Sequence, residues 1–208
     1  MKILVFCDTH GDLFLLEEAM KKEKDAEFTI CLGDTTIFNQ DIELIFEELT
    51  AFQKPLYMMF GNHEYEEDVE ELCKLHKFNF MHKSYKQING YDFLFFGGDG
   101  FSRRDKDFER TMQKLAKKCN PEKTILCLHG PPINTKLDVP FEDHHSGSES
   151  YREFIEKFKP LLALAGHIHE GEHEHDMIGK TFLVNPGPDG EIFDLEELHK
   201  QRIKSKKK

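Results

Sequence analysis

The sequence lacks the features that mark membrane, secreted and disulfide-stabilised proteins. No apolar run in its 208 residues approaches the roughly 20 residues that a membrane-spanning helix needs. The opening apolar stretch ends at Asp8, so it is too short for the apolar part of a signal peptide. The five cysteines include no Cys-x-x-Cys pair, and Cys7, Cys31 and Cys127 lie inside apolar runs. We therefore expect reduced thiols in the core of a cytoplasmic protein, with no membrane partner.

Basic residues are also scarce, and they are unevenly placed. The chain holds 28 lysines and arginines against 39 acidic residues, for a net charge of −11. Residues 199–208 contain six of the basic residues and no acidic one, which leaves a net −17 on residues 1–198. A basic groove for a nucleic-acid backbone is therefore not expected. We predict one domain over residues 1–198 and a basic, flexible tail over 199–208, with polyanion binding by the tail as an open alternative.

Five short apolar runs each stop at a side chain that can bind a metal. They end at Asp8-Thr9-His10, Asp34, Asn62-His63, His129 and His167-Ile168-His169. Runs that are apolar throughout, rather than alternating, are typical of strands buried on both faces of a helix-covered sheet. Ligands in such sheets bind at the carboxyl ends of the strands. We therefore expect these side chains to gather in one place.

The spacing and chemistry of these residues favour a two-metal site. Asp8 and His10 are two residues apart, as are His167 and His169, so a strand's period of two places each pair on one side. Three of the runs end in glycine, which allows a sharp turn next to a ligand. Carboxylate, amide and imidazole donors suit Mn, Fe, Co, Ni or Zn better than an all-oxygen Ca or Mg cage. The alternative is a set of unrelated surface histidines.

The rest of the chain alternates between helical and extended patterns. Apolar periodicity predicts helices over residues 12–24, 41–50, 69–75 and 107–118, and a further helix from Ser148 or Ser150 to Lys159. Residues 93–96, 181–184 and 191–193 add strands. Residues 130–148 show no periodicity, which is long for a structureless connection. They are expected to lie over the metals, either as a substrate lid or as a solvated loop.

These motifs together resemble those of a known family. Asp8-Thr9-His10, Gly33-Asp34, Gly61-Asn62-His63-Glu64, His129 and Gly166-His167-Ile168-His169 occur in the order of the calcineurin-like metallophosphoesterase signature. Asn185-Pro186-Gly187 is similar to an element of its small single-domain phosphodiesterases, although Cys7 and Pro188 replace the commoner serines. The resemblance implies an α/β (α+β) fold, a four-layer α/β/β/α sandwich. Its two mostly mixed sheets would be flanked by helices, with metals at the strand C-terminal ends.

The resemblance also implies a role for each residue. One divalent metal would be bound by Asp8, His10, Asp34 and His169, and the second by Asp34, Asn62, His129 and His167, with Asp34 bridging. Manganese is the expected metal, with Fe, Ni, Co or Zn as the other candidates. His63 remains free for catalysis. It would assist the leaving group while a hydroxide between the metals attacks phosphorus.

The substrate class is argued from what surrounds the motifs. Residues 35–39 lack the Asp-Arg-Gly of protein serine/threonine phosphatases, whose arginine grips a phosphomonoester. We therefore predict a phosphodiesterase for small nucleotide or cyclic nucleotide diesters. Nuclease, phosphomonoesterase and non-catalytic protein-binding scaffold are the alternatives. Arg103, Arg104 and His145 are candidate substrate contacts, although an exposed surface pair is the other interpretation of the two arginines.

Overall fold

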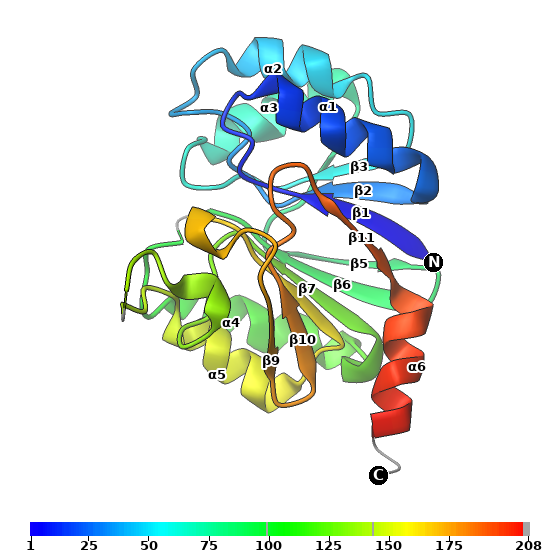
Figure 1. The fold of residues 1–208 in the computed structure, drawn as a ribbon, viewed down its shortest axis with the longest axis vertical. Helices are drawn as coiled ribbons and strands as arrows, with labels where there is room; N and C mark the ends of the chain where they lie inside the picture. Colours follow the sequence, from blue (N-terminus) through cyan, green and yellow to red (C-terminus); the bar gives the residue numbers. More distant parts are fainter. Residues whose placement is uncertain (99, 143, 206–208) are drawn as a thin grey trace.

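The computed structural model describes residues 1–98, 100–142 and 144–205. Its strands form two sheets (Figure 1). In the first sheet the order is β11-β1-β2-β3-β4, and in the second it is β5-β6-β7-β8-β10-β9. The strands of the first sheet are β1 (Lys2–Phe6), β2 (Phe28–Cys31), β3 (Leu56–Met58), β4 (Asn79–Phe80) and β11 (Glu191–Asp194). Those of the second are β5 (Ser84–Ile88), β6 (Tyr91–Phe96), β7 (Thr124–Leu128), β8 (Leu162–Leu164), β9 (His175–Ile178) and β10 (Thr181–Val184).

Both sheets are mixed, with parallel strands at the centre. β1, β2, β3 and β4 are parallel, and β11 pairs antiparallel with β1. In the second sheet β6, β7, β8 and β10 are parallel, while β5 and β9 are antiparallel at the edges. The parallel arrangement brings the carboxyl ends of the central strands to one edge of each sheet. The apolar runs of the sequence are these central strands.

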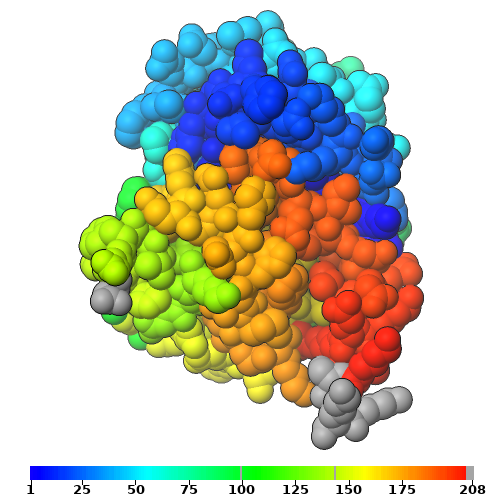
Figure 2. Space-filling view, viewed as in Figure 1, coloured from blue at the N-terminus to red at the C-terminus, as the bar shows by residue number. Residues whose placement is uncertain are grey.

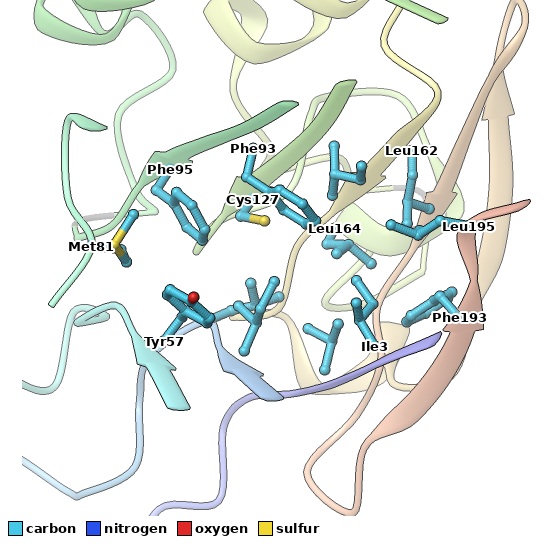
Figure 3. Close-up of a cluster of buried hydrophobic side chains, with 14 of the residues drawn as sticks. Ile3, Tyr57, Met81, Phe93, Phe95, Cys127, Leu162, Leu164, Phe193 and Leu195 are labelled. Carbon is cyan, nitrogen blue, oxygen red and sulfur yellow. The ribbon is translucent and has the colours of Figure 1, made fainter. Parts of the chain in front are cut away.

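The two sheets face each other across an apolar core (Figure 3). Ile3 and Tyr57 of the first sheet lie opposite Phe93, Phe95 and Cys127 of the second. Ile3, Phe93, Phe95 and Cys127 have no exposed surface. Burial of this kind contributes about 25 cal/mol per Å² of apolar surface, so this core is a main source of the fold's stability. It also fixes the position of one sheet against the other.

Helices cover the outer face of each sheet. α1 (Leu13–Lys22), α2 (Ile42–Leu49) and α3 (Glu66–His76) cover the first sheet, and α4 (Lys106–Leu115) and α5 (Glu149–Phe158) cover the second. In the space-filling view the blue and cyan N-terminal part lies above the green-to-orange part (Figure 2). The layers are therefore helix, sheet, sheet, helix, and the predicted fold class is confirmed.

Local sequence accounts for the helix boundaries. Asp12 caps α1 by accepting hydrogen bonds from the backbone N–H groups of Phe14 and Leu15. The helix predicted over residues 69–75 begins earlier, at Glu66, because three acidic residues in its first turn complement the helix dipole without adding apolar periodicity. Short 3-10 turns complete the connections. They are η1 (Glu23–Asp25), η2 (Ala116–Lys118), η3 (Pro121–Lys123), η4 (Lys136–Asp138) and η5 (His169–Gly171).

The C-terminal segment differs from the expected flexible tail. Residues 199–205 belong to α6 (Leu195–Ser205), and Arg202 is buried there. Its guanidinium donates to the carbonyl oxygens of Pro160 at 2.5 Å and Lys159 at 2.6 Å. The basic composition did not indicate this helix, because the sequence does not distinguish an arginine that donates to buried carbonyl oxygens from one that is solvated. Residues 206–208 lie outside the described residues. Among the helices that the structure describes, none combines the length and apolar character needed to cross a membrane.

Candidate metal centre

The metal-type side chains at the strand ends form three overlapping clusters. Each cluster offers three ligand atoms that lie within 4.8 Å of one another. The clusters are Asp8, His10 and His169; His10, Asp34 and His63; and Asp34, His129 and His167. Asn62 adjoins the third cluster, because its amide oxygen lies 2.9 Å from Nε2 of His129. The structure therefore brings all seven predicted ligands and His63 to one place, from both sheets.

Asp34 lies where the clusters meet. Its Oδ2 is 3.3 Å from Nε2 of His129 and 4.0 Å from Nε2 of His10. Its Oδ1 accepts a hydrogen bond of 2.9 Å from the backbone N–H of His63. One buried carboxylate thus faces two groups of imidazoles, which is the position that a bridging ligand requires.

The backbone at the centre adopts strained conformations. Asp8, His10, Asp34 and His167 have φ values of 55°, 46°, 55° and 72°. Non-glycine residues seldom adopt this left-handed region, and such strain concentrates at functional sites. Gly61 is required for space, because a Cβ there would collide with the Asp34 carboxylate and the His129 ring. The turns that aim these side chains inward are therefore maintained against a local energetic cost.

The donor atoms fit a pair of cations. Asp8 Oδ1 is buried and, within the described part of the chain, has no hydrogen-bond partner. Its other oxygen accepts the backbone N–H of His167 at 2.8 Å. Nearby, the Nε2 atoms of His10 and His169 face each other at 2.9 Å. An unpaired buried carboxylate oxygen is costly without a partner, and a bound cation would satisfy it.

The electrostatics of the centre point the same way. Burial lowers the pKa of His129, but the charge and hydrogen bond of Asp34, together with the charges of Asp8 and Glu64, outweigh it and raise that pKa to about 9. Burial raises the pKa of Asp34, but the charge and hydrogen bond of His129, together with the His63 backbone hydrogen bond and the His63 charge, reverse this and lower it to about 2. Burial, reinforced by the His129 charge, lowers the pKa of His167 to about 4, so its imidazole is neutral and available as a ligand. The ionised Asp34 carboxylate and the neutral His167 imidazole are therefore in the protonation states that metal binding requires.

A buried carboxylate that sequence reasoning left without a role supports the ligand turns. Glu64 accepts hydrogen bonds from the backbone N–H groups of Asp34 at 2.9 Å, Thr36 at 2.8 Å and Gly61 at 3.0 Å. Burial, together with the Asp34 charge, raises its pKa. The signal available in the sequence was its place directly after Asn62-His63. Glu64 holds the ends of β2 and β3 in register at the point where Asp34 and Asn62 leave them.

His63 belongs to one of the three clusters, with His10 and Asp34. Its ring centre is 4.7 Å from that of His10 and 4.4 Å from that of Phe38, against which it stacks. Nδ1 of His63 accepts a hydrogen bond of 3.4 Å from the backbone N–H of Phe38. Since a neutral imidazole that accepts at one nitrogen carries its proton on the other, Nε2 is the donor in this arrangement.

The predicted substrate contacts are engaged elsewhere. Nε of Arg103 lies 2.8 Å from Glu149, and Arg104 bonds to Glu149 at 2.9 Å and to Glu153. Nδ1 of His145 lies 2.7 Å from the fully buried Asp138. None of Arg103, Arg104 and His145 belongs to the ligand clusters of the described residues. The ion pairs fit the surface interpretation of the two arginines, and a substrate role for the three stays a prediction.

Fold and site together define a class of protein. Two mixed sheets between helical layers, with Asp, Asn and His at the strand ends, form an α/β sandwich with a candidate metal centre. Residues 1–171 match the profile of the calcineurin-like phosphoesterases, and the chain belongs to this family. Membership indicates a phosphoric ester hydrolase that uses divalent metals. No curated protein matches the chain in sequence.

Solved structures confirm the fold. A protein of Thermus thermophilus superimposes with a TM-score of 0.74 at 19% identity, covering 95% of each chain. An archaeal phosphodiesterase gives 0.58 at 19% identity, also covering 95% of each chain. A phosphopantetheinyl hydrolase from Mycobacterium tuberculosis gives 0.63 at 10% identity, covering 89% of this chain and 88% of that one.

Proposed function

We propose that this protein is a dinuclear-metal-dependent phosphodiesterase that acts on small phosphodiesters of nucleotide or cyclic nucleotide type. The observation that carries the proposal is the Asp34 carboxylate, which belongs to one cluster with His10 and His63 and to another with His129 and His167. A single carboxylate between two groups of imidazoles fits two adjacent cations. The similarity of the fold to an archaeal phosphodiesterase adds support to the choice of reaction.

Each residue has a defined place in this proposal. Asp8, His10, Asp34 and His169 would hold one cation, and Asp34, Asn62, His129 and His167 the other. When bound, the cations supply an activated water and offset charge on the phosphoryl oxygens. His63 would place the proton on its Nε2 against the departing ester oxygen, since Nδ1 accepts from Phe38. Phe38 and Asp34 together hold His63, through its ring and its backbone N–H.

Charge favours diesters over monoesters. A monoester dianion needs cationic side chains in addition to two metals, and residues 35–39 offer none. Arg103 and Arg104 already pair with Glu149 and Glu153. A diester carries a single negative charge and demands less. The net −17 of residues 1–198 also disfavours long nucleic acids, whose binding depends on neutralising many phosphates.

The test is a comparison of esters with the manganese-loaded protein. We expect bis-p-nitrophenyl phosphate and cyclic nucleotides to show higher kcat/KM than p-nitrophenyl phosphate, with two metal equivalents per chain. Plasmid DNA should be a poor substrate with weak salt dependence. Clear preference for monoesters would overturn the diesterase proposal. Retention of two tightly bound metals by Asp34→Asn would overturn the bridging assignment.

A further inference from the structure

A small pocket adjoins the candidate metal centre on the side of His10. Its volume is about 230 Å³. Leu13, Ile37 and Leu44 form its apolar wall, and Gln40 and Asp41 contribute polar groups. The pocket lies between the start of α1 and the connection that leads from β2 into α2.

The pocket is on the side where the leaving group departs, provided that the proposed function holds. His10 lines the pocket, and its ring centre is 4.7 Å from that of His63. His63 is the residue that we assign to the departing ester oxygen. An organic group attached to that oxygen would therefore have this pocket beside it.

The apolar wall is exposed to solvent. Leu13, Ile37 and Leu44 are 41%, 46% and 48% exposed. Three such side chains around one concavity provide apolar surface that a ligand can cover, at about 25 cal/mol per Å². The volume is below the roughly 300 Å³ at which drug-sized sites begin, so the pocket suits a single ring or a short chain.

The segment that forms the wall is held in a strained conformation. Phe38, Asn39 and Asp41 all have positive φ, between 49° and 60°. The backbone N–H of Asn39 donates to the carbonyl oxygen of His63 at 2.9 Å, which ties the segment to the centre. Strain of this kind persists where surrounding contacts impose it, and it clusters at ligand-binding segments.

Asp41 gives the pocket a polarity. It occupies the N-cap position of α2, yet its side chain makes no capping hydrogen bond. Its left-handed backbone, with φ of 52°, explains why the usual capping geometry is lost. A carboxylate at the pocket wall accepts hydrogen bonds from hydroxyl or amine groups and repels anions.

We propose that this pocket binds the leaving group of the diester, and that it selects a neutral, single-ring group with an apolar face and a hydroxyl or amine donor. The sugar ring of a nucleoside, with its hydroxyls, offers this chemistry, as does a hydroxymethyl-substituted phenol. The apolar wall would bind the ring, and Asp41 would accept from the donor.

The first experiment fills the pocket. Leu44→Trp should raise the KM for bis-p-nitrophenyl phosphate about tenfold while the chain keeps its metal content. The matched control is Leu75→Trp, because Leu75 is an exposed leucine on α3, at 70% exposure. We expect the control to behave as wild type. An unchanged KM in Leu44→Trp would overturn the proposal.

The second experiment tests selectivity through Asp41. Wild type should hydrolyse methyl 4-(hydroxymethyl)phenyl phosphate about tenfold better than methyl 4-carboxyphenyl phosphate, and Asp41→Asn should reduce this ratio to about twofold. The difference in leaving-group acidity is the same in both enzymes, so it cancels in the comparison. An unchanged ratio would remove Asp41 from the site.

A binding measurement separates the pocket from the proposed activity. The probe is 4-hydroxybenzyl alcohol, added to metal-free wild type and Leu44→Trp and followed by NMR shifts. Shifts around Leu13 and Ile37 in wild type alone would support the pocket, even if no ester is hydrolysed. Equal shifts in both proteins, or none in either, would overturn it while leaving the proposed phosphodiesterase untouched.

Discussion

Two connections in this molecule are each organised around a buried carboxylate. On the N-terminal side Glu64 is 7% exposed and accepts backbone N–H groups from both the β2–α2 connection and the end of β3. The hydroxyl of Thr36 adds a further bond at 3.0 Å. In residues 130–148 the corresponding group is Asp138, which has no exposed surface.

Asp138 gathers its own loop in the same way. It accepts from the backbone N–H groups of Asn134 at 3.1 Å, Thr135 at 2.8 Å and Gly147 at 3.0 Å. It also holds His145 at 2.7 Å. The segment predicted as structureless therefore contains a short 3-10 turn, η4, and an ordered hydrogen-bond network.

The difference lies in what the donors carry. The donors to Glu64 include Asp34, which is a proposed ligand, and Gly61, which precedes the proposed ligand Asn62. The donors to Asp138 belong to the loop alone, and His145 is outside the ligand clusters. One carboxylate therefore supports the turns of the candidate metal centre, and the other supports the loop of residues 130–148. In both places a buried carboxylate accepts several backbone N–H groups, but only Glu64 does so beside the proposed metal ligands.

The largest expected effect lies on the Glu64 side, at His63. His63→Ala should lower turnover of a diester with a poor leaving group by about 10²–10⁴-fold, because the proposed general acid is lost. The loss should be smaller for a nitrophenolate leaving group, which needs little protonation. Steady-state kinetics on the two substrates, with metal analysis of each preparation, measures this. A variant that loses its metals would show that His63 is a ligand.

Glu64→Ala should follow in size and should affect both stability and metal binding. It leaves three buried N–H donors unpaired, at about 1–3 kcal/mol each. We expect the unfolding free energy of the metal-free protein to fall by about 3–5 kcal/mol in urea. Metal titration should show weaker binding as well. Glu64→Gln, which keeps one acceptor oxygen, is the matched control and should lose about half as much.

Asp138→Ala should lower the unfolding free energy by about 2–4 kcal/mol for the same reason, but with both metals retained. Urea denaturation and elemental analysis of the same samples measure the two quantities, and Asp138→Asn serves as the conservative control. Loss of metal from Asp138→Ala would break the comparison, because it would show that the loop and the centre form one unit.

A smaller change in the free energy of unfolding is expected on acidification, and it arises from His82, which contacts neither Glu64 nor Asp138. Burial, aided by Lys83, lowers its pKa to about 4 from 6.5. The folded state therefore binds fewer protons than the unfolded state. The stability contributed is present above about pH 6.5 and is lost as pH falls towards 4, by about 2–3 kcal/mol. The variant His82→Phe should flatten this part of the stability curve; an identical slope would contradict the assignment.

The sequence predicted the structure correctly where the local pattern of residue types determines the element. Continuous apolar runs favoured buried strands, and the structure places the residues at their ends close together. The prediction from sequence failed where an element forms because of the neighbouring strand with which it pairs. β5 and β9 are edge strands with few buried residues, so their pattern resembles that of a loop.

The roles of Glu64 and Asp138 were hidden for a related reason. Nothing in a sequence shows that a carboxylate will be surrounded by backbone N–H groups from distant segments. The pocket beside His10 depends on the left-handed backbone of Phe38, Asn39 and Asp41, none of which is glycine. Propensity alone would not place those residues in that region.

The division of the ligands between the two sheets has a consequence for distant substitutions. Asp8, Asp34 and Asn62 follow strands of one sheet, while His129 and His167 follow strands of the other. With two cations bound as proposed, the distances between the ligands depend on the distance between the two sheets. A change in the volume of Phe95 or Cys127, deep in the layer between them, should therefore be read out as a change in metal affinity. A measured affinity for manganese would then report how closely the two sheets are packed.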